Sequence, residues 1–117
     1  MKNLDELVDE LNTHIKEYKF EEALNKFYYD GVVIVENEGA PIIGLSAYRE
    51  AAKRYIDSVS NYSAQLKNVI VSDEMSVSEW HYKFDHKQWG HWDRLQLSVQ
   101  RWKNGKIVHE RHHYNTQ

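Results

Sequence analysis

The stretch LQLSVQRWKNGKIVHERHHY, residues 95–114, decides the fold that we expect for this chain. It contains Asn104-Gly105 between two runs in which apolar and polar residues alternate. This dipeptide is the strongest short-range signal of a β-hairpin with a two-residue turn, because both central residues of a type I′ turn need a positive φ. The stretch therefore predicts two long antiparallel strands joined at residues 104 and 105.

The turn also predicts which residues share a face of this hairpin. Counting outward from it pairs Trp102 with Ile107, Val99 with Glu110, Leu97 with His112, and Leu95 with Tyr114. Successive side chains of a strand point to opposite faces of the sheet. We expect helices to cover the face formed by Leu95, Leu97, Val99, Val108, Glu110, His112 and Tyr114.

A second hairpin is expected upstream, with an even-numbered turn at Trp89-Gly90 that adds Trp80, Tyr82 and Phe84 to the covered face. The opposite face is polar with aromatic ends and carries Glu79, His81, Lys83, Trp92, Arg94, Gln96, Ser98, Gln100, Trp102, His109, Arg111 and His113. Antiparallel sheets often leave one face in water. Aromatic residues are enriched at interface centres, so Trp92 and Trp102 favour a homodimer through this outer face.

The first half of the chain has helical periodicity. Apolar residues at steps of three and four predict helices near residues 4–15, 20–28 and 48–59. Asn3 with Glu6 predicts a capping box at the first helix, and Asp30-Gly31 is expected to end the second. Val32–Val35 and Ile42-Ile43 predict a short hairpin between the second and third helices. The pattern indicates one α+β domain over residues 1–117, with three helices from the N-terminal half covering a curled antiparallel sheet.

The composition excludes several classes of function. The 15 basic and 18 acidic residues give a net charge of −3 and are spread along the chain, so no basic stripe predicts nucleic-acid binding. No apolar run approaches the roughly 18 residues that span a bilayer, so no membrane association is expected. The chain has no Cys, and its N-terminus is charged and amphipathic rather than signal-like, which favours a cytoplasmic protein.

The order of elements resembles the SnoaL-like branch of the nuclear-transport-factor-2-like (NTF2-like) superfamily. Asp30-Gly31-Val32-Val33, the turn that leads to Gly44, and the closing WKNGKIV at residues 102–108 carry the resemblance, which covers essentially the whole chain. It implies an NTF2-like, cystatin-like cone in which the sheet curls around a mostly apolar cavity roofed by helices. The superfamily includes polyketide cyclases, ketosteroid isomerase, dehydratases and non-catalytic proteins, so the resemblance implies a fold rather than one activity.

The catalytic residues of ketosteroid isomerase are not clearly retained at the matching positions. Its first helix carries a tyrosine where this chain has Leu11 or Asn12. Its basic aspartate follows the first strand, where this chain has Glu36-Asn37, and its hydrogen-bonding acid falls near Leu97 to Val99. The resemblance therefore does not supply a mechanism.

Glu110 and His112 are the candidate catalytic pair. They are two residues apart on the last strand, so both point to a face that is otherwise apolar and aromatic. Burial would raise the pKa of the carboxylate and lower that of the imidazole, while their mutual attraction opposes both shifts. Either residue could then act as an acid or a base near neutral pH, or the two could simply satisfy each other's hydrogen bonds.

Aromatic and apolar residues of the covered face are expected to form a pocket for a small apolar or cyclic ligand. We predict that the binding residues are Tyr18, Tyr28, Tyr55, Trp80, Tyr82, Phe84, Leu97, Val99 and Tyr114. Tyr hydroxyls there could orient the ligand, with Tyr28 or Tyr55 the first candidates, although each aromatic residue could equally be part of a packed core.

Histidine occurs in two further arrangements. His86 is expected opposite Asp93, as an oriented base or, with greater weight, as a surface ion pair. His109, His112 and His113 lie close in sequence, but adjacent residues of a strand point to opposite faces, so no metal site is predicted. No cofactor is expected either.

Two functions remain open from the sequence. The first is a cofactor-independent cyclase, isomerase or dehydratase that uses acid–base catalysis by Glu110 and His112 in an apolar pocket. The second is a non-catalytic module that binds a ligand or forms a homodimer.

Overall fold

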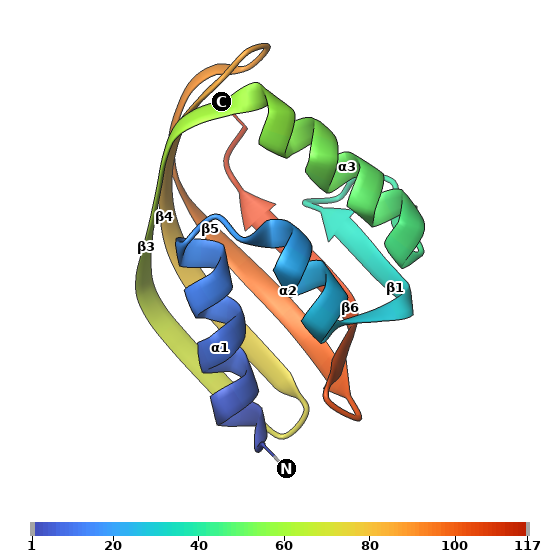
Figure 1. Ribbon diagram of the computed structural model, residues 1–117. Coiled ribbons are helices and arrows are strands. Elements are labelled where there is room, and N and C mark those ends of the chain that lie inside the picture. The colour runs from blue at the N-terminus through green and yellow to red at the C-terminus, as the bar shows by residue number, and fades with distance from the viewer. Residues whose placement is uncertain (1, 117) are drawn as a thin grey trace.

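Three helices cover one face of a six-stranded sheet in the computed structural model, which describes residues 2–116 (Figure 1). The helices are α1 (Leu4–Lys16), α2 (Phe20–Phe27) and α3 (Leu45–Ser58). The strands are β1 (Tyr28–Glu36), β2 (Ile42–Ile43), β3 (Val59–Ser72), β4 (Met75–His86), β5 (Gly90–Lys103) and β6 (Lys106–Tyr114). This arrangement confirms the predicted α+β class with three covering helices.

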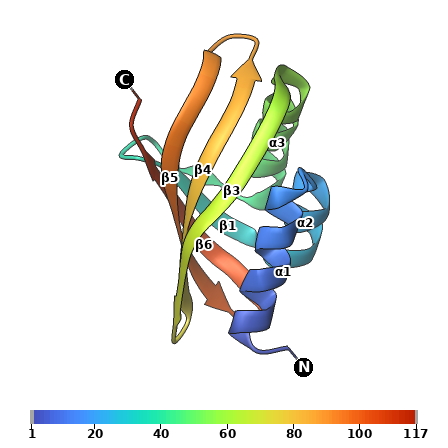
Figure 2. The same ribbon diagram turned by 90° about the vertical axis from the view of Figure 1, so that its left-hand side faces the viewer.

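The sheet has the strand order β2-β1-β6-β5-β4-β3. Neighbouring strands are antiparallel except β1 and β6, which run parallel. The sheet curls, and the helices lie along its concave side (Figure 2). Within residues 2–116, no helix combines the length and apolar character that a membrane crossing requires.

The start of α1 follows the predicted capping box. The Asn3 side chain accepts a hydrogen bond from the Glu6 backbone N–H, and the Glu6 carboxylate accepts one from the Asn3 backbone N–H. The apolar stripe of the helix then places Val8 and Leu11 in the core, where both are almost completely buried. Local sequence and tertiary packing agree here.

The end of α2 differs from the prediction. The helix ends at Phe27, and β1 begins directly at Tyr28, so Asp30-Gly31 lies inside a strand rather than at a helix stop. The pairing of β1 with β6 shifts register between Tyr28 and Val33. This irregularity accommodates Asp30-Gly31 within the strand without a turn.

The Asn104-Gly105 turn is confirmed, with φ values of 53° and 76°. The register farther along the hairpin is not as predicted, because a β-bulge interrupts it. Trp102 pairs with Ile107, but Arg101 pairs with His109, which leaves Val108 as an extra residue on β6. Beyond the bulge every predicted pair is wrong by one residue.

The bulge reverses the predicted faces of β5. Glu110 now lies opposite Gln100, His112 opposite Ser98, and Tyr114 opposite Gln96. The helices therefore cover the side of β5 that carries Gln96, Ser98, Gln100 and Trp102, while Leu95, Leu97 and Val99 lie on the outer face. Leu95 is 57% exposed and Leu97 is 39% exposed, whereas Ser98 and Gln100 are buried.

The two tryptophans assigned to a dimer interface are not on the outer face. Trp102 is 3% exposed, packs in the core beside Phe27, and donates a hydrogen bond to Ser76 Oγ at 2.9 Å. Trp92 is half-buried and stacks on Phe84 on the covered side. The prediction that Trp92 and Trp102 form a dimer contact is wrong because it depended on the unbulged register.

The β4–β5 hairpin places Trp80, Tyr82 and Phe84 on the covered face, as predicted, and all three are buried. The predicted pairing of His86 with Asp93 is wrong. His86 lies opposite Gly90 because three residues form the loop, and Asp93 lies opposite Lys83, where it contacts His81 Nε2 at 2.5 Å.

Candidate functional site

A cavity of about 450 Å³ lies between the helices and the concave face of the sheet. Its volume falls within the range of roughly 300–1,000 Å³ that is typical of small-molecule sites. Its lining combines aromatic rings with a few polar groups, as such sites usually do. The walls come from all three helices and from β1, β2, β4, β5 and β6.

The structure brings most of the predicted site residues to this cavity. Its lining includes Tyr28, Tyr55, Trp80, Tyr82, Phe84, Glu110, His112 and Tyr114. Leu97 and Val99 are not part of it, since the bulge turns them outward. Tyr18 is also outside the lining, and its hydroxyl donates a hydrogen bond to the Ile56 carbonyl at 3.1 Å.

Several lining residues were not among the predicted site residues. On the sheet they are Gln96, Ser98 and Gln100, which take the place of the predicted Leu97 and Val99. From the first strand and the third helix come Glu36 and Tyr48. The polar β5 residues and Tyr48 contact the Glu110–His112 pair directly, so they change its chemistry.

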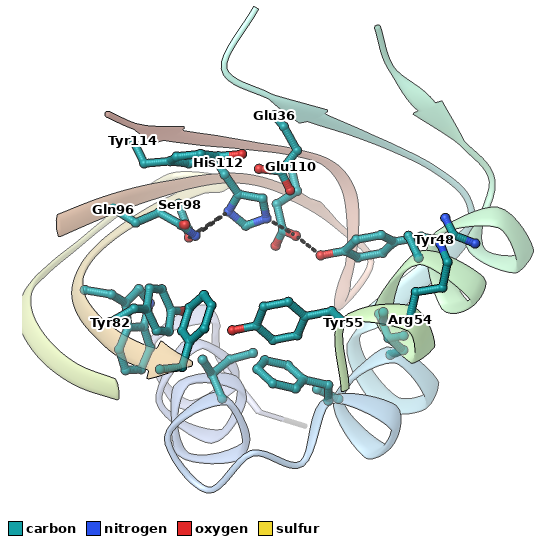
Figure 3. A pocket seen from close by; sticks show the side chains of 18 of the residues that line it. Glu36, Tyr48, Arg54, Tyr55, Tyr82, Gln96, Ser98, Glu110, His112 and Tyr114 are labelled. Carbon is teal, nitrogen blue, oxygen red and sulfur yellow. Dashed lines mark hydrogen bonds and ion pairs between the residues drawn. The ribbon is translucent and has the colours of Figure 1, made fainter. Parts of the chain in front are cut away.

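Glu110 is 1% exposed, and its carboxylate accepts four hydrogen bonds. Figure 3 shows those from His112 and Tyr48. Oε2 accepts from the Tyr28 hydroxyl at 2.5 Å and from Gln100 Nε2 at 2.7 Å. Oε1 accepts from the Tyr48 hydroxyl at 3.0 Å and from His112 Nε2 at 3.0 Å. An ionised carboxylate has about four lone-pair sites, so all of them are occupied.

The attraction between Glu110 and His112 decides their charges. Burial would raise the pKa of Glu110, but the charge of His112 and the hydrogen bonds from His112, Tyr28 and Gln100 outweigh it and lower the pKa. Burial would lower the pKa of His112, but the charge and hydrogen bond of Glu110, with a smaller effect of Glu36, raise it to about 9. Near neutral pH the pair is therefore a carboxylate and an imidazolium.

The second ring nitrogen of His112 faces β5. Its Nδ1 lies 3.0 Å from Ser98 Oγ and 3.1 Å from the Gln96 side-chain nitrogen. A charged ring carries a hydrogen on Nδ1, which donates to Ser98 Oγ. Two donors cannot pair, so the amide of Gln96 turns its oxygen toward the charged ring, since the two ends of the amide are alike in shape.

A second carboxylate, Glu36, lies on the cavity wall at the end of β1. It hydrogen-bonds the Tyr114 hydroxyl, and burial with the charge of Glu36 raises the pKa of Tyr114 to about 12. Glu36 is exposed, whereas Glu110 is enclosed by donors. Of the two carboxylates in the described lining, Glu36 is the one with room to accept a proton.

His86 lines another part of the cavity and is held neutral. Its Nδ1 accepts hydrogen bonds from the backbone N–H groups of Gln88 and Trp89, at 3.1 and 3.2 Å. Burial lowers the pKa of His86, and the ring stacks on Trp89 with centroids 3.7 Å apart. Its role is to shape the β4–β5 loop beside the cavity.

Each stretch that the resemblance sets against a catalytic residue of ketosteroid isomerase, namely Leu11 or Asn12, Glu36-Asn37, and Leu97 to Val99, contains one residue of the cavity lining. Asn12 is buried, lines the cavity and donates a hydrogen bond to Ser78 Oγ at 3.0 Å. Glu36 and Ser98 also line it. The three positions therefore reach one cavity, although their side chains differ from those of the isomerase.

No family model matches this sequence, and no curated protein is similar enough in sequence to match it. Solved structures do match. A protein from Mesorhizobium loti that is named as a SnoaL-like polyketide cyclase superposes with a TM-score of 0.87 at 17% identity, over 97% of this chain and 100% of that chain. An NTF2-like protein from Burkholderia thailandensis superposes with a TM-score of 0.83 at 15% identity, over 99% and 93%.

A third match contains a small ligand. It is a protein with a ketosteroid isomerase-like fold from Catenulispora acidiphila, solved in complex with trimethylamine. It superposes with a TM-score of 0.69 at 14% identity, over 80% of this chain and 74% of that chain. Together these matches show that the chain has the SnoaL-like, NTF2-like fold.

Proposed function

We propose that this chain binds a small, largely apolar, ring-containing molecule in its cavity and catalyses proton transfer on it without a cofactor. The reaction class would be that of an isomerase, cyclase or dehydratase of the SnoaL-like type. The observation that carries the proposal is the Glu110–His112 ion pair on the wall of a cavity that combines aromatic rings with a few polar groups. Buried charges are costly, so a charged pair placed beside an open cavity favours a functional role.

His112 would act as the electrophilic group. As an imidazolium it would stabilise negative charge on a ligand carbonyl oxygen, and its Nδ1–H would donate to that oxygen in place of Ser98 Oγ. Glu110 would be a positioning residue, because its hydrogen bond and charge hold His112 protonated and its own lone pairs are filled. This assigns the two predicted catalytic residues different roles.

Glu36 would act as the base. Its carboxylate would take a proton from the carbon next to the ligand carbonyl, and the electron pair of the broken C–H bond would move onto the carbonyl oxygen beside His112. Return of the proton to another carbon completes an isomerisation. Protein carboxylates and an imidazole suffice for each step, so no redox reagent is needed.

The test uses 2-tetralone, a flat bicyclic ketone with exchangeable hydrogens beside its carbonyl. We expect the protein to accelerate exchange of these hydrogens in D₂O, followed by proton NMR at neutral pD. Glu36→Gln and His112→Gln should each slow the catalysed exchange by about a hundredfold, the usual contribution of general acid–base catalysis. His113→Gln, on the opposite face of β6, is the matched control and should retain the wild-type rate.

A second candidate function is ligand binding without catalysis. The four hydrogen bonds at Glu110 support it, because a carboxylate with no free lone pair can serve structure alone. Saturable binding of 2-tetralone with exchange no faster than in buffer would favour this candidate and contradict catalysis.

We also propose that a second copy of the chain pairs on the outer face of the sheet. The support is an apolar stripe made of Ile70, Val77, Leu95, Leu97 and Val99, on the side away from the helices. Glu79 and Arg101 flank the stripe, so a two-fold arrangement can place opposite charges against each other.

A further inference from the structure

Two tyrosine hydroxyls in the aromatic half of the cavity have no hydrogen-bond partner among the described residues. Tyr55 comes from α3 and Tyr82 from β4, and both line the cavity. Tyr82 is only 9% exposed. Within residues 2–116, every fully buried side-chain nitrogen or oxygen atom has a hydrogen-bond partner. Because the Tyr55 and Tyr82 hydroxyls have none, they are not fully buried and open onto the cavity.

Tyr55 and Tyr82 belong to different walls of the cavity, one on α3 and the other on β4. Figure 3 shows the Tyr55 hydroxyl directed across the cavity toward the side on which Tyr82 lies. Burial raises the pKa of Tyr82 far above its ordinary value, and Tyr62 and then Tyr55 add to that shift. Burial raises the pKa of Tyr55 as well, so both remain neutral phenols that can donate hydrogen bonds.

The hydroxyls of neighbouring tyrosines donate hydrogen bonds to acceptors within the protein, unlike those of Tyr55 and Tyr82. The Tyr62 hydroxyl donates to the Ile15 carbonyl at 2.8 Å, and the Tyr18 hydroxyl donates to the backbone of α3. The surroundings of the free pair are apolar, since Tyr55 packs edge-on against Phe84 at 5.3 Å. Both hydroxyls open onto the cavity and have no acceptor among the described residues, so an acceptor on a bound ligand can take their hydrogen bonds.

We propose that Tyr55 and Tyr82 form a second polar subsite, which donates hydrogen bonds to an oxygen at the far end of the ligand. The inference rests on the proposed function, because it takes the carbonyl end of the ligand to lie beside His112. It narrows the ligand class to ring-containing molecules that carry two oxygens, a carbonyl at one end and a hydroxyl or second carbonyl at the other.

The experiment compares 6-hydroxy-2-tetralone with 6-methyl-2-tetralone, which has nearly the same shape but lacks the second oxygen. Equilibrium dialysis measures both dissociation constants. We expect the wild-type protein to bind the hydroxy compound about fivefold more tightly, the effect of one hydrogen bond of ordinary strength. The double variant Tyr55→Phe/Tyr82→Phe should lose that preference and still bind the methyl compound.

Tyr18→Phe/Tyr62→Phe is the matched control, since those hydroxyls already have backbone acceptors, and it should keep the preference. Tyr55→Phe alone, which removes one donor and little volume, should reduce the preference in part. A preference that persists in the double variant, or is missing from the wild type, would overturn the subsite while exchange of 2-tetralone could still support the proposed function. Failure of both compounds to bind would overturn the proposed function and the subsite together.

Discussion

His112 Nε2 lies 3.0 Å from Glu110 Oε1, and both side chains are buried on the wall of the cavity. The contact joins residues two apart on one strand, so it needs no long-range assembly to form. Its charge state does depend on the fold, because Tyr28, Tyr48 and Gln100 come from three other elements. The pair therefore links the chemistry of the site to the stability of the whole domain.

Substituting Glu110 by Gln should lower the pKa of His112 from about 9 to below 6.5, because burial would then act without the opposing charge. Imidazole chemical shifts followed by NMR across pH measure this directly. The unfolding free energy should fall by about 3 kcal/mol, as expected when one member of a buried pair is removed. Glu79→Gln, on the outer face, should leave the His112 titration unchanged. An unaltered His112 pKa in the Glu110 variant would refute the assigned charges.

Stability should decrease as the pH rises from about 6.5 to about 9. His112 has a higher pKa in the folded chain than the ordinary value of 6.5, so in this interval the folded state holds a proton that the unfolded state has released. This stabilisation is fully present below pH 6.5 and is lost as the pH rises through 9. A pKa shift of this size corresponds to about 3 kcal/mol in total. Urea unfolding at several pH values measures the slope. His112→Gln should abolish it, and a wild-type stability that is flat over this interval would contradict the prediction.

Replacing Trp102 by Phe should destabilise the fold by about 2 kcal/mol, through the lost hydrogen bond to Ser76 and the lost packing volume. Trp89→Phe is the comparison, because Trp89 is 56% exposed, and it should change the unfolding free energy by less than about 0.5 kcal/mol. Thermal and urea unfolding distinguish the two. Equal effects would argue against the core position of Trp102.

Placing a charge at the centre of the outer stripe should abolish self-association. Leu97→Lys is expected to convert a dimer to a monomer at micromolar concentration, because two lysines would meet across a two-fold axis. Light scattering gives the mass, and circular dichroism checks the fold. Lys83→Gln, on the same face but outside the stripe, should leave the dimer intact. A monomeric wild-type protein would contradict the proposed pairing.

The sequence was sufficient to predict the elements and the partners Glu110 and His112, because these depend on local pattern. Helical periodicity, the Asn3 cap and the Asn104-Gly105 turn are each determined within a few residues, and each is confirmed. The inward side of β6 was predicted correctly from Glu110 onward, whereas before the bulge Ile107, not Val108, lies in the core. This prediction depended only on the alternation of residues within β6.

The side of β5 that faces inward could not be obtained in the same way. Leu95, Leu97 and Val99 alternate with Gln96, Ser98 and Gln100, so the pattern identifies two faces without saying which one is covered. Apolar residues usually face inward, but here polar residues of β5 face the cavity because they contact a buried ion pair. A bulge has no clear signal in the sequence, and it reversed the assignment.

Val108, the extra residue of the bulge, determines which chemistry the last strand offers to the cavity. If β5 kept its place and Val108 paired with Arg101 in a regular ladder instead of forming the bulge, the alternation of β6 would present His109, Arg111 and His113 inward in place of Glu110, His112 and Tyr114. The cavity would then exchange an acidic residue for a cluster of basic ones and favour anionic ligands. Removal of the bulge with Val108 retained would thus redirect the specificity of this cavity.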